Sequence, residues 1–127
     1  MEKRNLGNTG TKVGALGIGA MSFSDFYGPT NTQESHAILK MALDNGIDHI
    51  DTAKVYGMGL SEERIGQFLN TLSPNDRQSF KIATKGGIDR KNFDDKGTVV
   101  FDNSKEFLTE ELNNSLKRLG VDCVELY

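Results

Sequence analysis

Three residues whose side chains could transfer a proton together stand where two predicted strands end. Asp51 follows a short apolar segment, Tyr56 comes five residues later, and Lys85 closes the next predicted strand. Reduction of a carbonyl by hydride needs a proton donor at the carbonyl oxygen, and a tyrosine hydroxyl can serve if a nearby ammonium stabilises the phenolate it leaves. A carboxylate would hold that ammonium in place. These residue types therefore form a sensible proton-relay group.

Each of these residues, taken alone, has a more ordinary explanation. An acid at the end of a strand usually caps a turn or pairs with a base. A lone tyrosine more often packs with its hydroxyl bonded, and a lone lysine is most often solvated. Residue type and spacing alone are therefore weak evidence for a catalytic group. The secondary-structure elements that position these residues are stronger evidence.

The chain alternates predicted strands and helices after a small hairpin. Gly and Asn in the turn 7–10 favour a hairpin between residues 4–6 and 11–13. Strands are predicted at 15–21, 47–53, 81–85 and 121–127, helices at 32–45, 61–72 and 104–119, and a polar loop at 88–103. Strands that alternate with helices indicate right-handed crossovers and a parallel sheet.

Capping residues and apolar spacing define the three predicted helices. Asn31 or Thr32 begins the first, with Glu34 placed as in a capping box, Ser61 begins the second, and Asn103 or Ser104 begins the third. The apolar faces are predicted to contain Ile38, Met41 and Ala42 in the first helix, Ile65, Phe68, Leu69 and Leu72 in the second, and Leu108, Leu112, Leu116 and Leu119 in the third.

The predicted fold class is α/β, as part of a (β/α)8 TIM barrel. A complete barrel takes about 250 residues, so about four βα units and a preceding hairpin in 127 residues correspond to half of one. We therefore expect residues 1–127 to be one incomplete domain, which ends inside a predicted strand. In a parallel barrel the strands end at one mouth, where the catalytic residues lie. Asp51, Tyr56 and Lys85 should meet there.

Net charge, apolar runs and cysteine content limit the binding partners and the cellular compartment that we expect for this chain. A net charge of −3 without a long basic run argues against nucleic acid and anionic membranes. No apolar run approaches the ~18 residues of a membrane helix, and the polar start lacks a signal-peptide pattern, so the cytoplasm is the default expectation. The single Cys123 excludes an internal disulfide framework. It is predicted to be buried in a strand, and with His36 and His49 it lacks metal-ligand spacing.

The order of short motifs resembles the aldo-keto reductase family, and most closely its bacterial or plant-like subgroup. The motifs cover essentially the whole chain: LGNTG (6–10), LGIGAM (16–21), FYGP (26–29), DTAKVYG (51–57), SEERIG (61–66), IATKGG (82–87) and SLKRLGVD (115–122). The combination of Asp and Tyr in DTAKVYG with TK at the end of a later strand is highly specific for this family. LGNTG alone would be weak evidence for it.

The resemblance implies a (β/α)8 barrel that reduces small aldehydes and ketones to alcohols with NADPH. Asp51, Tyr56 and Lys85 match the aspartate, the acid/base tyrosine and the lysine of the family's catalytic tetrad. The tetrad histidine is expected a few residues beyond Tyr127. The chain by itself is therefore expected to have little or no activity.

The cofactor is expected beside the end of the first strand. By the same resemblance, Gly19, Ala20 and Met21 match a segment next to the nicotinamide, and Asp51 also touches the nicotinamide ribose. Phe23, Phe26 and Tyr27 fall in a loop that lines the substrate pocket in this interpretation. No metal is implied.

Three further hypotheses complete the sequence-based account. Lys54 occupies a position that is often acidic in the family, and we expect its side chain to be solvated. His49 is expected to be a hydrogen-bonded core histidine. As an alternative to an enzyme, the chain could be a non-catalytic half barrel that self-associates through open sheet edges or acts as an interaction module.

Overall fold

The computed structural model describes residues 1–89 and 99–127, and it begins with the predicted hairpin. Strands β1 (Lys3–Asn5) and β2 (Lys12–Gly14) pair antiparallel. Asp48 attaches this hairpin to the rest of the fold, because the Gly14 N–H donates a hydrogen bond of 2.6 Å to its Oδ1 and the Lys3 ammonium pairs with its Oδ2.

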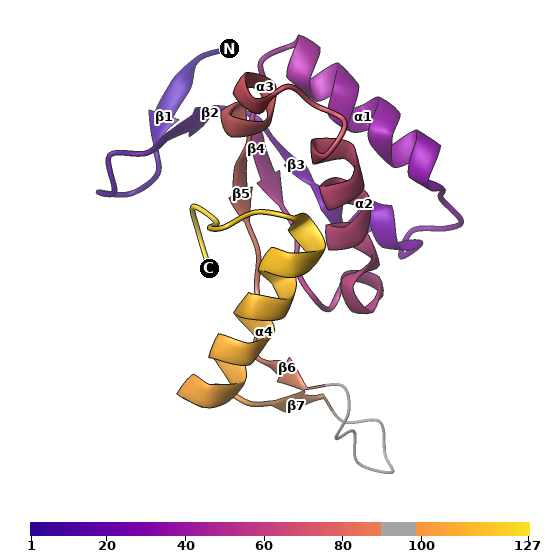
Figure 1. The fold of residues 1–127 in the computed structure, drawn as a ribbon, viewed down its shortest axis with the longest axis vertical. Helices are drawn as coiled ribbons and strands as arrows, with labels where there is room; N and C mark the ends of the chain where they lie inside the picture. The colour runs from indigo at the N-terminus through magenta and orange to yellow at the C-terminus, as the bar shows by residue number, and fades with distance from the viewer. Residues whose placement is uncertain (90–98) are drawn as a thin grey trace.

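A parallel sheet forms the centre of the fold (Figure 1). Strands β3 (Gly17–Gly19), β4 (His49–Asp51) and β5 (Lys81–Ala83) lie side by side in that order. The register places Gly19 opposite Asp51, and Asp51 opposite Ala83. The last residues of the three strands are therefore aligned at one edge of the sheet.

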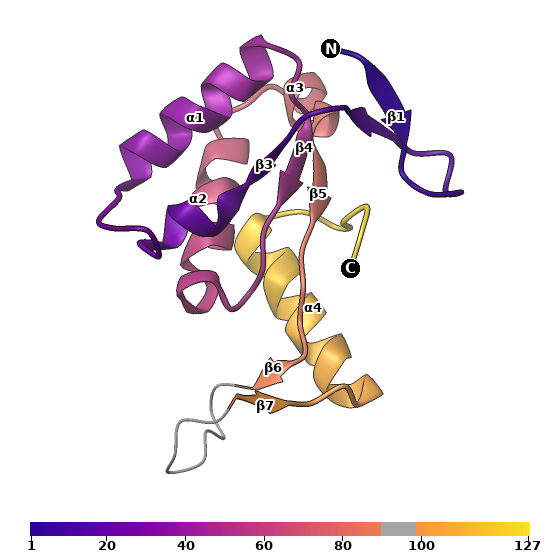
Figure 2. The ribbon, with the colours of Figure 1, turned by 180° about the vertical axis from the view of Figure 1, so that it is seen from behind.

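Helices connect these strands and pack against the sheet (Figures 1 and 2). Helix α1 (Thr32–Asp44) joins β3 to β4, α2 (Leu60–Leu69) and the short α3 (Pro74–Ser79) join β4 to β5, and α4 (Lys105–Leu119) follows β5. The core between helices and sheet contains the fully buried Leu39, Ile50, Ile65 and Leu119. The predicted α/β class is confirmed: the described residues form part of a (β/α)8 barrel, with the sheet open.

The predicted apolar faces of two helices are only partly correct. In α1, Ala42 is buried as predicted, but Ile38 and Met41 are 46% and 68% exposed, and Ser35 and Leu39 are buried. In α4 the buried residues are Glu111, Ser115 and Leu119, and the other predicted leucines are only half-buried. Glu111 pairs with Lys54, and Ser115 accepts a hydrogen bond from Arg118. Polar partners therefore allow these polar side chains to be buried.

The start of α2 also differs from the prediction. Gly59, with a φ of 104°, precedes the first helical residue, and Ser61 lies inside the helix. The Ser61 hydroxyl donates to the Ala20 carbonyl at 2.8 Å and lies 2.9 Å from the Thr52 hydroxyl. Ser61 therefore ties α2 to the ends of β3 and β4. The Asn31 capping box of α1 and the Ser104 cap of α4 are confirmed.

Two connections differ from the predicted pattern. The residues directly after the second predicted helix form the short helix α3, which the sequence did not predict and which Ser73 caps. Part of the predicted polar loop 88–103 forms an antiparallel hairpin, β6 (Ile88–Asp89) with β7 (Val100–Phe101), and residues 90–98 lie outside the described residues.

The predicted fourth strand is reduced to a single parallel bridge between Ala83 and Leu126. Cys123 in this segment is exposed, not buried as predicted. Within the described ranges, no helix is long and apolar enough to cross a membrane.

Replacing Asp48 with Asn should destabilise the protein by about 1–3 kcal/mol at neutral pH, because the Lys3 and Gly14 donors lose a charged acceptor. Burial raises the pKa of Asp48, but the hydrogen bonds from Lys3 and Gly14 and the charge of Lys3 outweigh it, so the pKa lies below its ordinary value. A lowered carboxyl pKa stabilises the fold above about pH 4 and loses that effect as the pH falls through the folded-state value. Urea unfolding should therefore show a difference between Asp48→Asn and wild type at pH 7 that shrinks in acid. An equal difference at both pH values would contradict this assignment.

Candidate functional site

The aligned strand ends form the base of the candidate site. β3 continues directly into a short 3-10 helix (Ala20–Ser24), and the chain after β4 reaches a tight turn (Tyr56–Gly59) in which Gly57 and Met58 have left-handed backbone angles. The chain after β5 runs extended through Lys85 to the hairpin β6–β7. Three connections that are distant in sequence therefore leave the sheet at the same edge.

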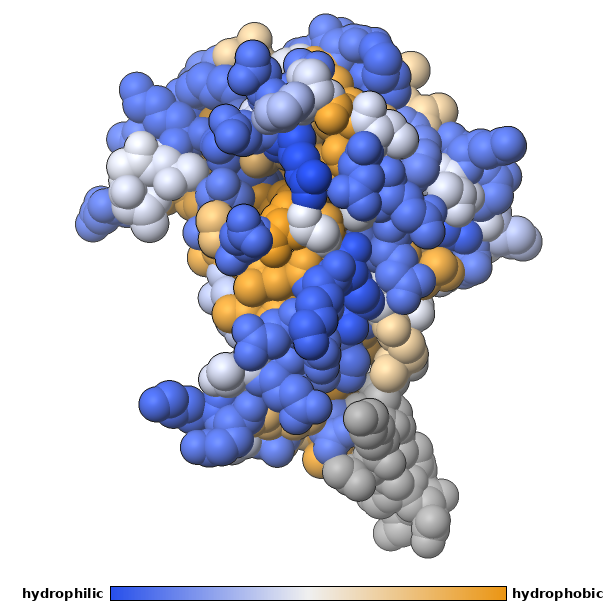
Figure 3. All heavy atoms as spheres, viewed as in Figure 1, coloured by the Kyte–Doolittle hydropathy of each residue, from blue (hydrophilic) through white to orange (hydrophobic). Residues whose placement is uncertain are grey.

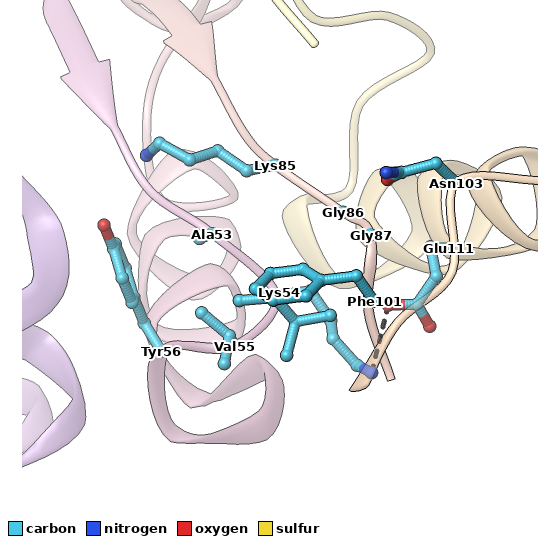
Figure 4. A pocket seen from close by; sticks show the side chains of 11 residues that line it. Ala53, Lys54, Val55, Tyr56, Lys85, Gly86, Gly87, Phe101, Asn103 and Glu111 are labelled. Carbon is cyan, nitrogen blue, oxygen red and sulfur yellow. Dashed lines mark ion pairs between the residues drawn. The ribbon is translucent and has the colours of Figure 1, made fainter. Parts of the chain in front are cut away.

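Asp51, Lys85 and Tyr56 are brought together at this edge. The Lys85 ammonium pairs with the Asp51 carboxylate and donates a hydrogen bond of 2.8 Å to the Thr52 carbonyl. It lies 5.2 Å from the centroid of the Tyr56 ring, within the range of a cation–π contact. In Figure 4 the Tyr56 hydroxyl and the Lys85 ammonium point toward each other. The Asp51 and Lys85 side chains are 44% and 49% exposed, so the group is accessible.

Main-chain hydrogen bonds hold the connection that contains Tyr56. The Thr52 N–H donates to the Ala83 carbonyl at 2.9 Å, and the Lys54 N–H donates to the Lys85 carbonyl at 3.3 Å. Gly57 follows Tyr56 with a φ of 63°, and a Cβ there would lie 2.9 Å from the Cβ atoms of Leu60 and Ser24. Glycine at this position permits the tight turn that presents the tyrosine.

A cavity of about 330 Å³ opens beside Tyr56 and Lys85. Its walls come from the connection after β4, the connection after β5 and the hairpin β6–β7, and the first turns of α4 close it (Figure 4). Phe101, Asn103 and Glu111 line it, and the sequence did not indicate any of the three. Phe101 and Asn103 lie in a segment predicted to be a polar loop, and Glu111 looks like an ordinary polar residue on a helix surface.

The prediction for Lys54 is wrong. Its side chain is not solvated but pairs with Glu111 of α4, with 3.0 Å between Lys54 Nζ and Glu111 Oε2, and each side chain is only 12% exposed. The dashed line in Figure 4 marks this ion pair. Because its partner lies 57 positions away in the sequence, the pattern around Lys54 could not reveal it.

The three residues of the predicted cofactor segment, Gly19, Ala20 and Met21, differ in how far they are buried. Gly19 is exposed, and nothing lies within 4 Å of the point where a Cβ would be. Ala20 is fully buried and its carbonyl accepts from Ser61, whereas Met21 is half-buried. Gly19 stands next to Asp51 in the sheet, so an open space and a carboxylate adjoin each other. A ligand group at these strand ends would have free space at Gly19 and a hydrogen-bond acceptor at Asp51.

The aromatic residues of the loop after β3 do not line the described cavity. Phe23 is buried in the core, and Phe26 and Tyr27 are 66% and 72% exposed with their rings in contact edge to face. The expectation that they line the substrate pocket finds no support in this arrangement. His49 is hydrogen-bonded as expected, with Nδ1 3.2 Å from the Lys81 carbonyl, but it is half-buried and not a core residue.

The carboxylates of Glu111 and Glu62 affect the hydroxyl of Tyr127. Burial raises the pKa of Tyr127, and the negative charges of Glu111 and Glu62 raise it further. The Tyr127 hydroxyl donates to the Leu108 carbonyl at 3.2 Å. Among residues 1–89 and 99–127, no group of three or more His, Cys, Asp or Glu side chains could hold a metal ion.

The fold and the group at the strand ends define a partial (β/α)8 barrel with a polar mouth. The family model of the aldo/keto reductase family matches residues 15–127. The chain therefore belongs to the aldo/keto reductase family.

Relatives and solved structures agree with this assignment. The chain is 34% identical to "Aldo-keto reductase yakc [NADP(+)]" of Schizosaccharomyces pombe, over 98% of this chain and 35% of that protein. It is 35% identical to L-galactose dehydrogenase of Arabidopsis thaliana, over 99% of this chain and 37% of that one. An aldo-keto reductase of Bacillus halodurans in its holo form superposes with a TM-score of 0.81 at 33% identity, over 100% of this chain and 39% of that one. The chain thus spans little more than a third of the length of these relatives.

Proposed function

We propose that this chain contributes the proton-donor side of an NADP(H)-dependent oxidoreductase that reduces small aldehydes and ketones to alcohols. The observation that carries the proposal is the Lys85 ammonium, which Asp51 and the Thr52 carbonyl hold beside the ring of Tyr56. Membership of the family supports oxidoreductase chemistry in general. The relative named with NADP(+) supports the choice of cofactor.

The three side chains divide the proton transfer among them. Tyr56 donates its hydroxyl proton to the carbonyl oxygen as that oxygen gains negative charge. Lys85 stabilises the resulting phenolate by Coulomb attraction, and Asp51 keeps the lysine on the tyrosine side of the mouth. Bound NADPH would supply the hydride to the carbonyl carbon, so that the product is an alcohol.

The cofactor is proposed to lie across the ends of β3 and β4. Gly19 and Met21 would flank its nicotinamide end, Ala20 would anchor this segment through its buried side chain, and Asp51 would accept a hydrogen bond from the ribose. The open space at Gly19 beside the exposed Asp51 supports this placement.

Cys123 is exposed and unpaired, which fits a reducing compartment such as the cytoplasm.

A second candidate function is self-association. Figure 3 shows an apolar area beside the C-terminal segment, between the hairpin β1–β2 and helix α4. Leu126 in this segment is 49% exposed, and its main chain makes the single bridge to β5. Two copies of the chain could bury this area against each other. Light scattering tests this: a stable dimer supports the candidate, and a monomer at all concentrations contradicts it.

The Lys85→Met variant tests the proposed enzyme. The assay follows NADPH absorbance with model aldehydes, first with the chain alone and then with a hybrid in which it replaces the matching region of "Aldo-keto reductase YhdN" of Bacillus subtilis, which is 34% identical over 100% of this chain. The chain alone should show little turnover, because three parallel strands enclose only part of a barrel mouth. Lys85→Met should lower kcat of the hybrid at least tenfold, since the phenolate loses its ammonium, whereas Lys12→Met at the exposed hairpin should leave kcat unchanged. Full turnover by Lys85→Met would contradict the role of Lys85.

A further inference from the structure

We infer that the ion pair between Lys54 and Glu111 positions Tyr56 against Lys85. The inference rests on the proposed function, because it assigns the pair a task in the same site. Lys54 and Glu111 are positioning residues in this account. They act through Tyr56 and Lys85 and are not assigned a contact with the reacting atoms.

The ion pair lies in nearly buried surroundings. Both side chains are 12% exposed, and Lys54 Nζ lies 3.0 Å from Glu111 Oε2. This oxygen is buried and makes no hydrogen bond in the described structure, so the contact is an ion pair without hydrogen-bond geometry. Charges removed from water attract each other more strongly than exposed ones, and an unpaired buried charge is costly. Separation of the two side chains would therefore leave unpaired charges in nearly buried positions.

The pair is connected to both halves of the proton-relay group. The main-chain N–H of Lys54 donates to the carbonyl of Lys85, and two residues later the N–H of Tyr56 donates to the carbonyl of Ala53. Lys54 thus bonds to the main chain of Lys85 and lies inside the short turn that the bond between Tyr56 and Ala53 closes. Its side chain leads away from that group to α4, as Figure 4 shows.

Helix α4 is a rigid point of attachment. It runs over 15 residues, and Glu111 lies on its buried face with Ser115 and Leu119. Arg118 of the same helix donates to Glu62 of α2 at 2.7 Å. The ion pair therefore fixes the connection after β4 to a helix that is itself locked to its neighbour.

Loss of the pair should let this connection move relative to β5. The Lys54 side chain would leave the helix, and the Tyr56 ring would no longer keep a fixed distance from Lys85. A misplacement of about 1 Å in an active site can cost on the order of 100-fold in rate. We expect kcat to fall about 10- to 100-fold with KM little changed, because neither residue of the pair is assigned to the cofactor.

The test uses nuclear magnetic resonance on the full chain. The readout is the nuclear Overhauser effect between the Lys85 ε-methylene protons and the Tyr56 ring, which reports their distance directly. It is measured in Glu111→Gln, in Lys54→Met and in the swapped variant Lys54→Glu with Glu111→Lys. The matched control is Asp44→Asn, which removes the exposed Lys40–Asp44 pair on α1.

The single variants should lose at least half of this signal, the control should keep it, and the swapped pair should regain most of it. Full signal in folded single variants would overturn the inference. If a single variant does not fold, the neutral double variant Lys54→Met with Glu111→Gln, which buries no charge, replaces it with the same expectation. The hybrid assay separates the two proposals: full turnover by Tyr56→Phe would defeat the proposed function, whereas unchanged kcat in the folded pair variants would defeat only the positioning.

Discussion

Replacing Arg118 with Met is expected to destabilise the protein by about 3–5 kcal/mol, because a buried carboxylate would lose its counter-charge. Glu62 is fully buried and accepts a hydrogen bond of 2.7 Å from Arg118 Nε. Its other oxygen accepts from the Thr84 hydroxyl at 2.6 Å. Thr84 directly precedes Lys85, so loss of the Arg118–Glu62 pair should also disturb the position of Lys85 at the candidate site. Urea unfolding followed by circular dichroism measures the effect.

A double variant separates the charge from the packing. In Arg118→Met with Glu62→Gln no charge remains buried, and most of the lost stability should return. Arg4→Met is the exposed control, since the Arg4 and Glu2 side chains are 67% and 71% exposed, and it should change stability by less than about 0.5 kcal/mol. Wild-type stability in Arg118→Met alone would show that the pair does not hold α2 to α4.

Local signals predicted the frame of the fold correctly. The turn 7–10, the capping box of Asn31 and the Ser104 cap are properties of short segments, and the structure contains each of them. The positions of β3, β4 and β5 follow from apolar runs in the same way. Short-range chemistry was sufficient for these features because every partner lies within a few residues.

Features that depend on distant partners could not be predicted. The buried face of α4 contains Glu111 because Lys54 reaches it from the connection after β4. Gly66 of α2 lacks a side chain because a Cβ there would overlap the carbonyl oxygen of Arg118. Phe101 reaches the cavity only because the hairpin β6–β7 forms. No pattern around any of these residues indicates its partner.

In the candidate site, too, some residues could be predicted from local sequence and others depend on distant partners. Asp51, Tyr56 and Lys85 could be placed together because parallel strands end at one mouth. Their proximity is now visible, and their catalytic roles stay predictions. The residues that support them, above all Lys54 and Glu111, became apparent only from the tertiary contacts.

Replacing Tyr56 with Phe should lower carbonyl reduction about 10²- to 10⁴-fold, the range expected for loss of a general acid. The substitution removes only the hydroxyl, so the ring can stay beside Lys85 and the fold should be unchanged. Tyr27→Phe is the matched control, because the Tyr27 side chain is 72% exposed and lies outside the described cavity. It should retain full activity.

The turnover of Tyr56→Phe in the YhdN hybrid is the measurement that tests the central claim most directly. Aldehyde-dependent loss of NADPH absorbance is compared between this variant, Tyr27→Phe and the unsubstituted hybrid. The account predicts a loss of at least about 100-fold in Tyr56→Phe alone. Turnover within a few-fold of the unsubstituted hybrid would contradict the assignment of Tyr56 as the proton donor.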